Sequence, residues 1–82
     1  MDIDSISVGE YTEYVRFEDA IKALLRVECE LPPAHNDFRA LVKRLLQAGP
    51  YGDAPRSPAE VSAFKVRVYA DVYGPEWKTL VA

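Results

Sequence analysis

The residue types that most often carry chemistry are scarce in this sequence, which has one histidine, His35, and one cysteine, Cys29. A thiol and an imidazole can form a nucleophile–base pair where they meet in space. These two residues are six positions apart, across Pro32 and Pro33, so such a pair is conceivable. The simpler interpretation is a half-buried cysteine at a helix end and a solvated histidine in a loop. We therefore predict no catalytic residues.

Metal and cofactor motifs are also missing from the sequence. Four potential metal ligands lie around one turn: Glu28, Glu30, His35 and Asp37. Their spacing matches no known ligand pattern, and solvated charge accounts for them better. The glycines of segment 49–52 mark a turn and are not followed by the Lys-Ser/Thr pair of a phosphate-binding loop. We expect no metal, no cofactor and no enzymatic activity.

Length and composition predict one globular domain over residues 1–82. The chain has 49% apolar and 28% charged residues and a net charge of -3, which is neither a disordered nor a strongly basic composition. Its longest apolar runs are three residues, so no membrane span is expected. The single thiol and the lack of a signal-like N-terminus favour the cytoplasm.

The clearest helix signal covers residues 37–48. Apolar residues recur there at helical spacing: Phe38, Leu41, Val42, Leu45 and Leu46. Asn36 is positioned to cap the helix start, and Gly49 to take the left-handed conformation that ends it. Pro50 blocks continuation.

A second helix is predicted over residues 58–73. Ser57, Pro58 and Glu60 form a capping box, in which the glutamate reaches back to the amide of the cap residue. The competing interpretation is a strand over 61–73, because apolar and polar residues also alternate there. Such a strand would have to pair with the N-terminal segment 3–17, which would make the fold α+β.

The N-terminal third predicts a helix over residues 17–29 with its apolar side chains on one face. Glu18, Lys22 and Arg26 follow at four-residue spacing, and we expect them to face outward. This helix starts at residue 8 if Ser7 caps it; otherwise residues 1–16 form an acidic arm.

The predicted fold is all-α: a small three-helix bundle with helices at about 8 or 17–29, 37–48 and 58–73. A short C-terminal tail, residues 75–82, follows the last helix. Its apolar side chains, Trp77, Leu80 and Val81, should pack back on the body or meet a neighbour.

Aromatic residues are the first functional clue, since the 82 residues include five Tyr, three Phe and one Trp. A core this small is expected to enclose only some of these rings. Tyr and Trp are favoured at contact surfaces because an apolar ring ends in a polar group. Tyr69 and Tyr73 are one turn apart, and Trp77 follows shortly after. We expect these three to form a partner-binding patch, the alternative being that they edge the core.

Charge is the second clue, because it is unevenly distributed. Residues 1–19 hold six acids and one base, and Glu10 and Glu13 are among the acids. Arg39 and Lys43 lie one turn apart on the 37–48 helix. A solvated surface explains both groups; a functional interpretation adds these four residues to the partner-binding set.

The sequence therefore predicts a small non-catalytic protein that binds another protein as a regulator or inhibitor, of the kind encoded by phages and mobile elements. One alternative is a helix-turn-helix-like DNA-binding protein that uses residues 37–48, although the few bases argue against a nucleic-acid partner. Another is an accessory subunit of a multi-chain enzyme. A homodimer is compatible with the small core.

Overall fold

Residues 16–49 and 51–81, which the computed structural model describes, form four helices and no strand. The helices are α2 (Phe17–Glu28), α3 (His35–Ala48), α4 (Pro58–Tyr73) and α5 (Trp77–Leu80). The all-α prediction is confirmed, and the strand alternative for residues 61–73 is wrong. Residues 1–15 lie outside the described part, and with them the predicted helix start at residue 8 and nearly all of the predicted acidic arm.

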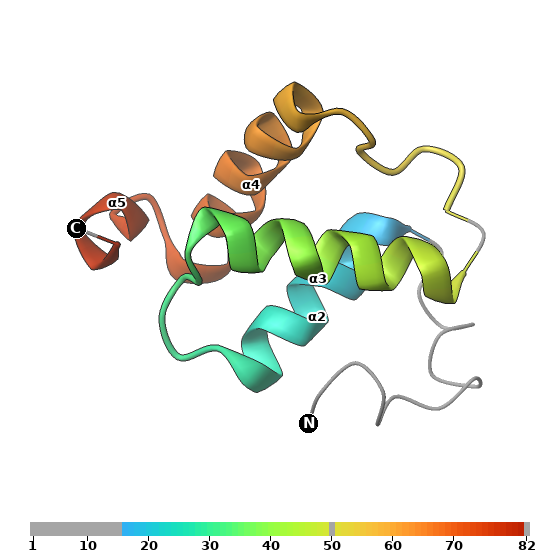
Figure 1. Ribbon diagram of the computed structural model, residues 1–82. Helices are drawn as coiled ribbons and strands as arrows, with labels where there is room; N and C mark the ends of the chain where they lie inside the picture. The colour runs from blue at the N-terminus through green and yellow to red at the C-terminus, as the bar shows by residue number, and fades with distance from the viewer. Residues whose placement is uncertain (1–15, 50, 82) are drawn as a thin grey trace.

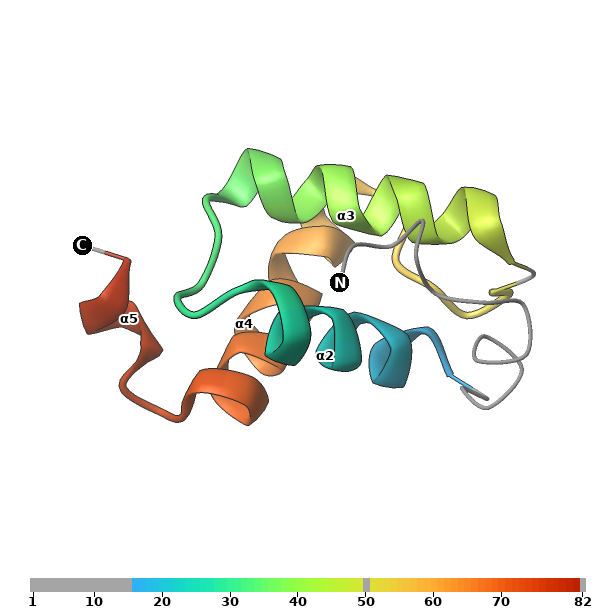
Figure 2. The ribbon, with the colours of Figure 1, turned by 90° about the horizontal axis from the view of Figure 1, so that it is seen from below.

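The helices form a small bundle in which α3 lies across the pair formed by α2 and α4 (Figures 1 and 2). The loop over residues 51–57 lies at one end of the bundle, and α5 lies at the other (Figure 1). All three long helices contact one another, so each buries one face in a shared core.

The start of α3 differs from the prediction. The helix begins at His35, its N-cap position is Ala34, and no side chain caps it. Asn36 is therefore inside the first turn and does not cap the helix. We attribute the earlier start to the extended Pro32–Pro33 segment, which ends just before Ala34.

The end of α3 also has a different cause from the predicted one. Gly49 has a φ of -159°, which is extended backbone that any residue adopts, so the left-handed prediction is wrong. A Cβ atom at this position would lie 2.8 Å from Cε2 of Tyr51. A side chain here would therefore have to displace the Tyr51 ring, whereas the φ angle alone would accept any residue.

The predicted start of α4 is confirmed, with one change in its hydrogen bonds. The Ser57 hydroxyl accepts from the Glu60 amide at 3.1 Å, as a capping serine should. The Glu60 carboxylate accepts from the Arg56 amide at 3.4 Å and from the Ser57 hydroxyl at 3.2 Å, not from the Ser57 amide as expected. The helix ends at Gly74, whose φ of +91° favours glycine.

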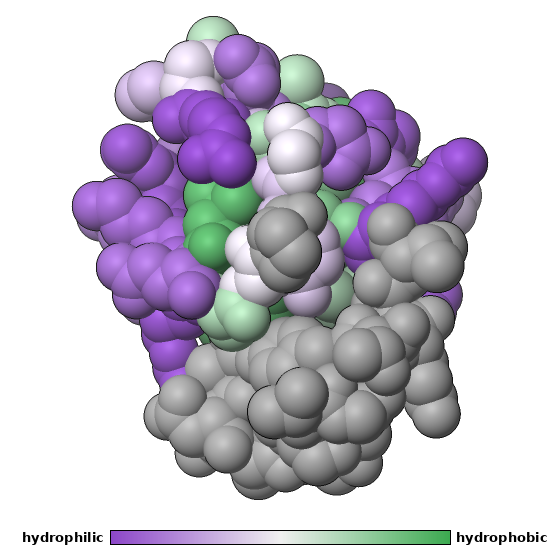
Figure 3. Space-filling view, turned by 90° about the vertical axis from the view of Figure 1, so that its right-hand side faces the viewer, coloured by the Kyte–Doolittle hydropathy of each residue, from purple (hydrophilic) through white to green (hydrophobic). Residues whose placement is uncertain are grey.

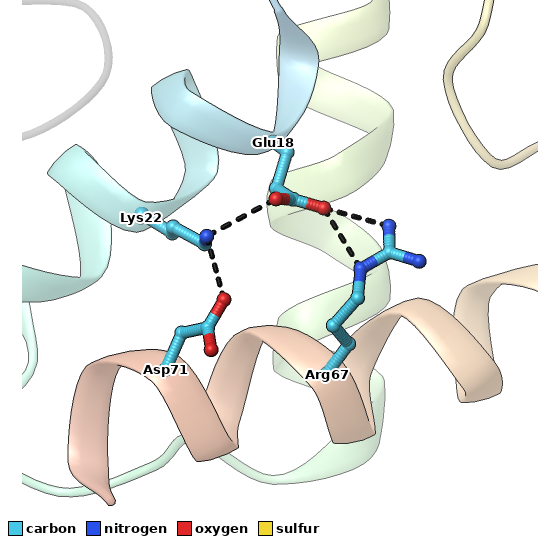
Figure 4. Close-up of polar contacts among 4 residues, drawn as sticks. All are labelled: Glu18, Lys22, Arg67 and Asp71. Atoms are coloured by element: carbon cyan, nitrogen blue, oxygen red, sulfur yellow. Dashed lines mark hydrogen bonds and ion pairs between the residues drawn. The ribbon is translucent and has the colours of Figure 1, made fainter.

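Four charged side chains connect α2 to α4 (Figure 4). Lys22 Nζ lies 3.1 Å from Glu18 Oε2 and 2.6 Å from Asp71 Oδ2, and Arg67 Nη2 lies 2.7 Å from Glu18 Oε1. Hydrogen bonding from Lys22 is the main cause that lowers the pKa of both carboxyls. Glu18 and Lys22 therefore face α4, and the prediction that they point outward is wrong, whereas Arg26 is exposed.

A continuous series of aromatic contacts runs through the core. Each ring centroid lies 5.2–6.0 Å from the next, which is the favourable range for aromatic pairs. In order, the rings belong to Tyr51, Phe17, Phe64, Phe38 and Tyr69, and Tyr69 then contacts both Tyr73 and Trp77. All seven aromatic residues of the described part belong to this series, so aromatic packing supplies much of the core.

Candidate functional site

The Cys29–His35 pair does not show the features of a catalytic dyad. Cys29 is half-buried at the end of α2, and burial is the main cause that raises the pKa of its thiol. A raised pKa leaves less of the nucleophilic thiolate at neutral pH. His35 is half-buried in the first turn of α3, so the expectation of a solvated loop histidine is wrong.

Three buried polar atoms near the ends of the helices lack a hydrogen-bond partner among the described residues: Glu28 Oε1, His35 Nδ1 and Tyr73 Oη. They come from the last turn of α2, the first turn of α3 and the last turn of α4. The described residues hold no group of three His, Cys, Asp or Glu side chains placed to bind a metal. These atoms therefore mark imperfect polar packing and do not form a ligand set.

The aromatic patch predicted at Tyr69, Tyr73 and Trp77 is not an exposed surface. Tyr69 is 1% exposed and Trp77 is 8% exposed, so both belong to the core. Tyr73 is half-buried and packs against that core. The small turn α5 brings the Trp77 ring to 5.2 Å from the Tyr69 ring, an arrangement that the sequence spacing does not reveal. As packed here, Tyr69 and Trp77 are inaccessible to a partner.

The two tyrosines of this group differ in their hydroxyl contacts. The Tyr69 hydroxyl donates to the Pro33 carbonyl at 2.6 Å and so ties α4 to the segment before α3. The Tyr73 hydroxyl lies beside the Cys29 thiol without a hydrogen bond of ordinary geometry to any described residue. Burial raises the pKa of both phenols, that of Tyr73 to about 12.

The exposed large apolar side chains are aliphatic, which the sequence analysis missed. They lie on α2, on the segment after it, on α4 and at the C-terminal end: Val27, Leu31, Val66, Leu80 and Val81. Of the two expected outcomes, packing back on the body holds for Trp77 but not for Leu80 and Val81, which are exposed. Single exposed aliphatic residues are common on protein surfaces, so their exposure by itself does not indicate a binding site.

An open groove of about 590 Å³ lies between the start of α2, the 53–55 segment and the first half of α4. Buried Phe17 and Phe64 line it together with charged groups of both signs. Its Arg67 is already held by Glu18. Figure 3 views the end of the molecule with the 51–57 loop, where a small hydrophobic area lies among hydrophilic side chains. The mixed charge of the groove favours no single class of ligand.

The predicted cation pair on α3 is on the surface. Arg39 and Lys43 are exposed, and neither makes an ion pair or hydrogen bond with another described residue. Residues four apart on a helix have their Cβ atoms about 5–6 Å apart, so the two charges lie side by side. The small exposed residue Ala40 is next to Arg39 and adds little bulk to this face.

Comparison with known proteins identifies no relative: no family model, no curated protein and no solved structure matches the chain. Every helix in residues 16–49 and 51–81 is too short or too polar to cross a membrane. Of the other predicted contact residues, Glu10 and Glu13 lie outside the described residues.

Proposed function

We propose that this chain is a non-catalytic protein–protein interaction protein and that it binds an acidic partner surface through α3. The observation that carries the proposal is the α3 cation pair, Arg39 and Lys43. Both side chains are exposed and have no anionic partner among the described residues. Two unpaired neighbouring cations favour a partner with closely spaced carboxylates.

Five other basic residues of the described part make contacts within the fold. Lys22 and Arg67 form ion pairs with acids of α2 and α4. Arg56 donates to the Tyr51 carbonyl. Two lysines lie near aromatic faces, Lys65 at 5.9 Å from the Tyr69 ring and Lys78 at 5.8 Å from the Trp77 ring. Because these charges support the fold, the α3 cation pair is better suited than they are to an external contact.

A protein partner fits the charge pattern better than duplex DNA does. DNA affinity comes mainly from neutralising several phosphates at once. The whole chain carries a net charge of -3, which opposes a long contact with a polyanion. Two adjacent cations match a short acidic patch. Binding of this kind, without chemistry, would make the chain a regulator or inhibitor of its partner.

The proposal is tested by fluorescence polarisation with a short labelled peptide of alternating Glu and Ala. We expect binding at low salt that weakens as salt is added, because exposed charge contacts are screened. The double variant Arg39→Gln/Lys43→Gln should bind about tenfold more weakly, since each exposed ion pair contributes up to about 1 kcal/mol. The matched control Arg16→Gln/Arg26→Gln removes the same charge from other exposed positions and should bind within about twofold of wild type.

The outcomes separate the competing functions. No binding by wild type at low salt, or equal loss in the two double variants, would overturn the proposal. A labelled DNA duplex is measured in parallel. If it binds more tightly than the peptide and is released by Arg39→Gln/Lys43→Gln, the DNA-binding alternative replaces the proposal.

A further inference from the structure

Four exposed polar side chains follow one another at one-turn intervals along the outer side of α3. They are three, four and four residues apart, so in a helix that rises 1.5 Å per residue they span about 16 Å. None of these side chains makes a hydrogen bond or ion pair with another residue of the described part. We call this set the α3 row: Asn36, Arg39, Lys43 and Gln47.

The charge of the α3 row is not neutralised by α3 itself. The one acidic residue of this helix is Asp37, in the first turn. At about 100° per residue, Asp37 lies about 160° around the helix from Arg39 and about 120° from Lys43. The outer side of α3 faces away from α2 and α4, and no other described helix covers it (Figure 2). The row is therefore accessible to a partner segment that lies along α3.

The centre of this side of α3 carries a small side chain. Ala40 is exposed and lies one turn from both Asn36 and Lys43. Packed helices have their axes about 8–10 Å apart, depending on the side chains at the contact. A methyl group at this point permits the closer approach. A helix that packs over Ala40 would bring its own side chains within reach of both cations.

The backbone of the bound segment also favours a helix. Backbone amides and carbonyls that lose water on binding need another hydrogen-bond partner. An extended segment finds such partners at a sheet edge, and the part of the chain that the structure describes contains no strand. A helix satisfies its own backbone and presents only side chains. Carboxylates four residues apart on it repeat at about 6 Å, which is the repeat of Arg39 and Lys43.

We propose that the acidic partner surface is an α-helix with acidic residues four positions apart on one face, and that it lies along the α3 row. This inference rests on the proposed function and names the form of the partner. Two carboxylates of the partner helix pair with Arg39 and Lys43. The amides of Asn36 and Gln47 hydrogen-bond to polar side chains one turn to either side.

The test compares two helical peptides of the same composition, each with four Glu among Ala and Gln residues. In the one-face peptide the Glu residues are at i, i+4, i+7 and i+11; in the spread peptide they are distributed around the helix. A side-chain staple holds both helical, and circular dichroism checks that their helicity is equal. We expect wild type to bind the one-face peptide about fivefold more tightly, which is the effect of one additional exposed ion pair. This preference should disappear in Arg39→Gln/Lys43→Gln.

A second variant tests the close approach at Ala40. Ala40→Gln keeps the charges and a high helix propensity but adds bulk beside the α3 row. It should weaken binding of the one-face peptide about three- to fivefold, because holding the partner helix farther away weakens an ion pair. The matched control Ala48→Gln changes another exposed alanine of α3, about 140° around the helix from Lys43, and should bind within about twofold of wild type. Equal affinities in the two variants would overturn the inference.

The alternating Glu-Ala peptide, which is not held helical, separates this inference from the proposed function. If that peptide binds but wild type does not distinguish the one-face from the spread peptide, the inference is overturned and the proposed function stands. The same holds if an unstapled one-face peptide with a central proline, which breaks the helix, binds as tightly as the helical form. If none of these peptides binds at low salt, both proposals fail.

Discussion

Replacing Tyr69 with Phe removes one hydroxyl group from the core and leaves the ring in place. Tyr69 is 1% exposed, and its hydroxyl donates to the Pro33 carbonyl at 2.6 Å. The hydrogen bond joins the middle of α4 to the segment between α2 and α3. In Tyr69→Phe the carbonyl loses this donor while the aromatic contacts remain.

The expected cost follows from the burial of the donor. A typical hydrogen bond contributes about 0.5–1.5 kcal/mol, and leaving a buried partner unsatisfied costs about 1–3 kcal/mol. The Pro33 residue is half-buried, so we expect a loss of about 1–2 kcal/mol in the free energy of unfolding. Tyr73→Phe is the matched control, because it removes a hydroxyl that has no hydrogen-bond partner among the described residues.

The assay is urea unfolding followed by circular dichroism, with the free energy extrapolated linearly to water. We expect Tyr69→Phe to lower the midpoint without changing the slope, and Tyr73→Phe to stay within about 0.5 kcal/mol of wild type. A Tyr69→Phe protein as stable as wild type would show that the hydrogen bond does not stabilise the fold. Equal losses in the two variants would refute the distinction between the two hydroxyls.

Two further predictions concern the ion pairs and the end of α3. Lys22→Met should cost about 1 kcal/mol in urea unfolding near neutral pH, because Lys22 holds both Glu18 and Asp71. The pKa of each carboxyl is lowered in the folded state, so this stabilisation is lost as the pH falls below their ordinary values of 4.5 and 3.8. The free energies of unfolding of wild type and variant should therefore converge in acid. A difference that stays constant with pH would contradict this cause. Gly49→Ala should lower the free energy of unfolding by about 1 kcal/mol, because its Cβ would lie 2.8 Å from a ring atom of Tyr51 and that ring, which packs on Phe17, would have to move. Gly52→Ala, whose Cβ has no neighbour within 4 Å, should be near neutral. Equal melting temperatures for the two variants would contradict the steric account.

The three long helices were predictable because their signals are local. The apolar stripe of α3 and the serine–proline start of α4 depend only on residues close in sequence, and both helices form as expected. The alternation over 61–73 was a true ambiguity, and helix is the observed outcome. The described part offers no strand with which residues 61–73 could pair.

The surface assignments were less predictable. Arg39 and Lys43 were correctly expected on an exposed face, because the apolar stripe of their own helix fixes the opposite side. Glu18 and Lys22 follow the same rule on α2, yet they lie at the edge where α4 packs. Which edge of a helix meets a neighbour depends on the packing of the whole bundle and cannot be read from one helix.

The amino-acid sequence by itself determined that three long helices form, and it located each of them to within a few residues. Only the tertiary structure decided which aromatic residues are buried. Tyr69 and Trp77 are buried because α5 folds back against α4, and Tyr51 covers Phe17 from a loop. The physical reason is that periodicity reports the environment along one element, whereas burial depends on contacts between segments that the chain brings together only when it folds.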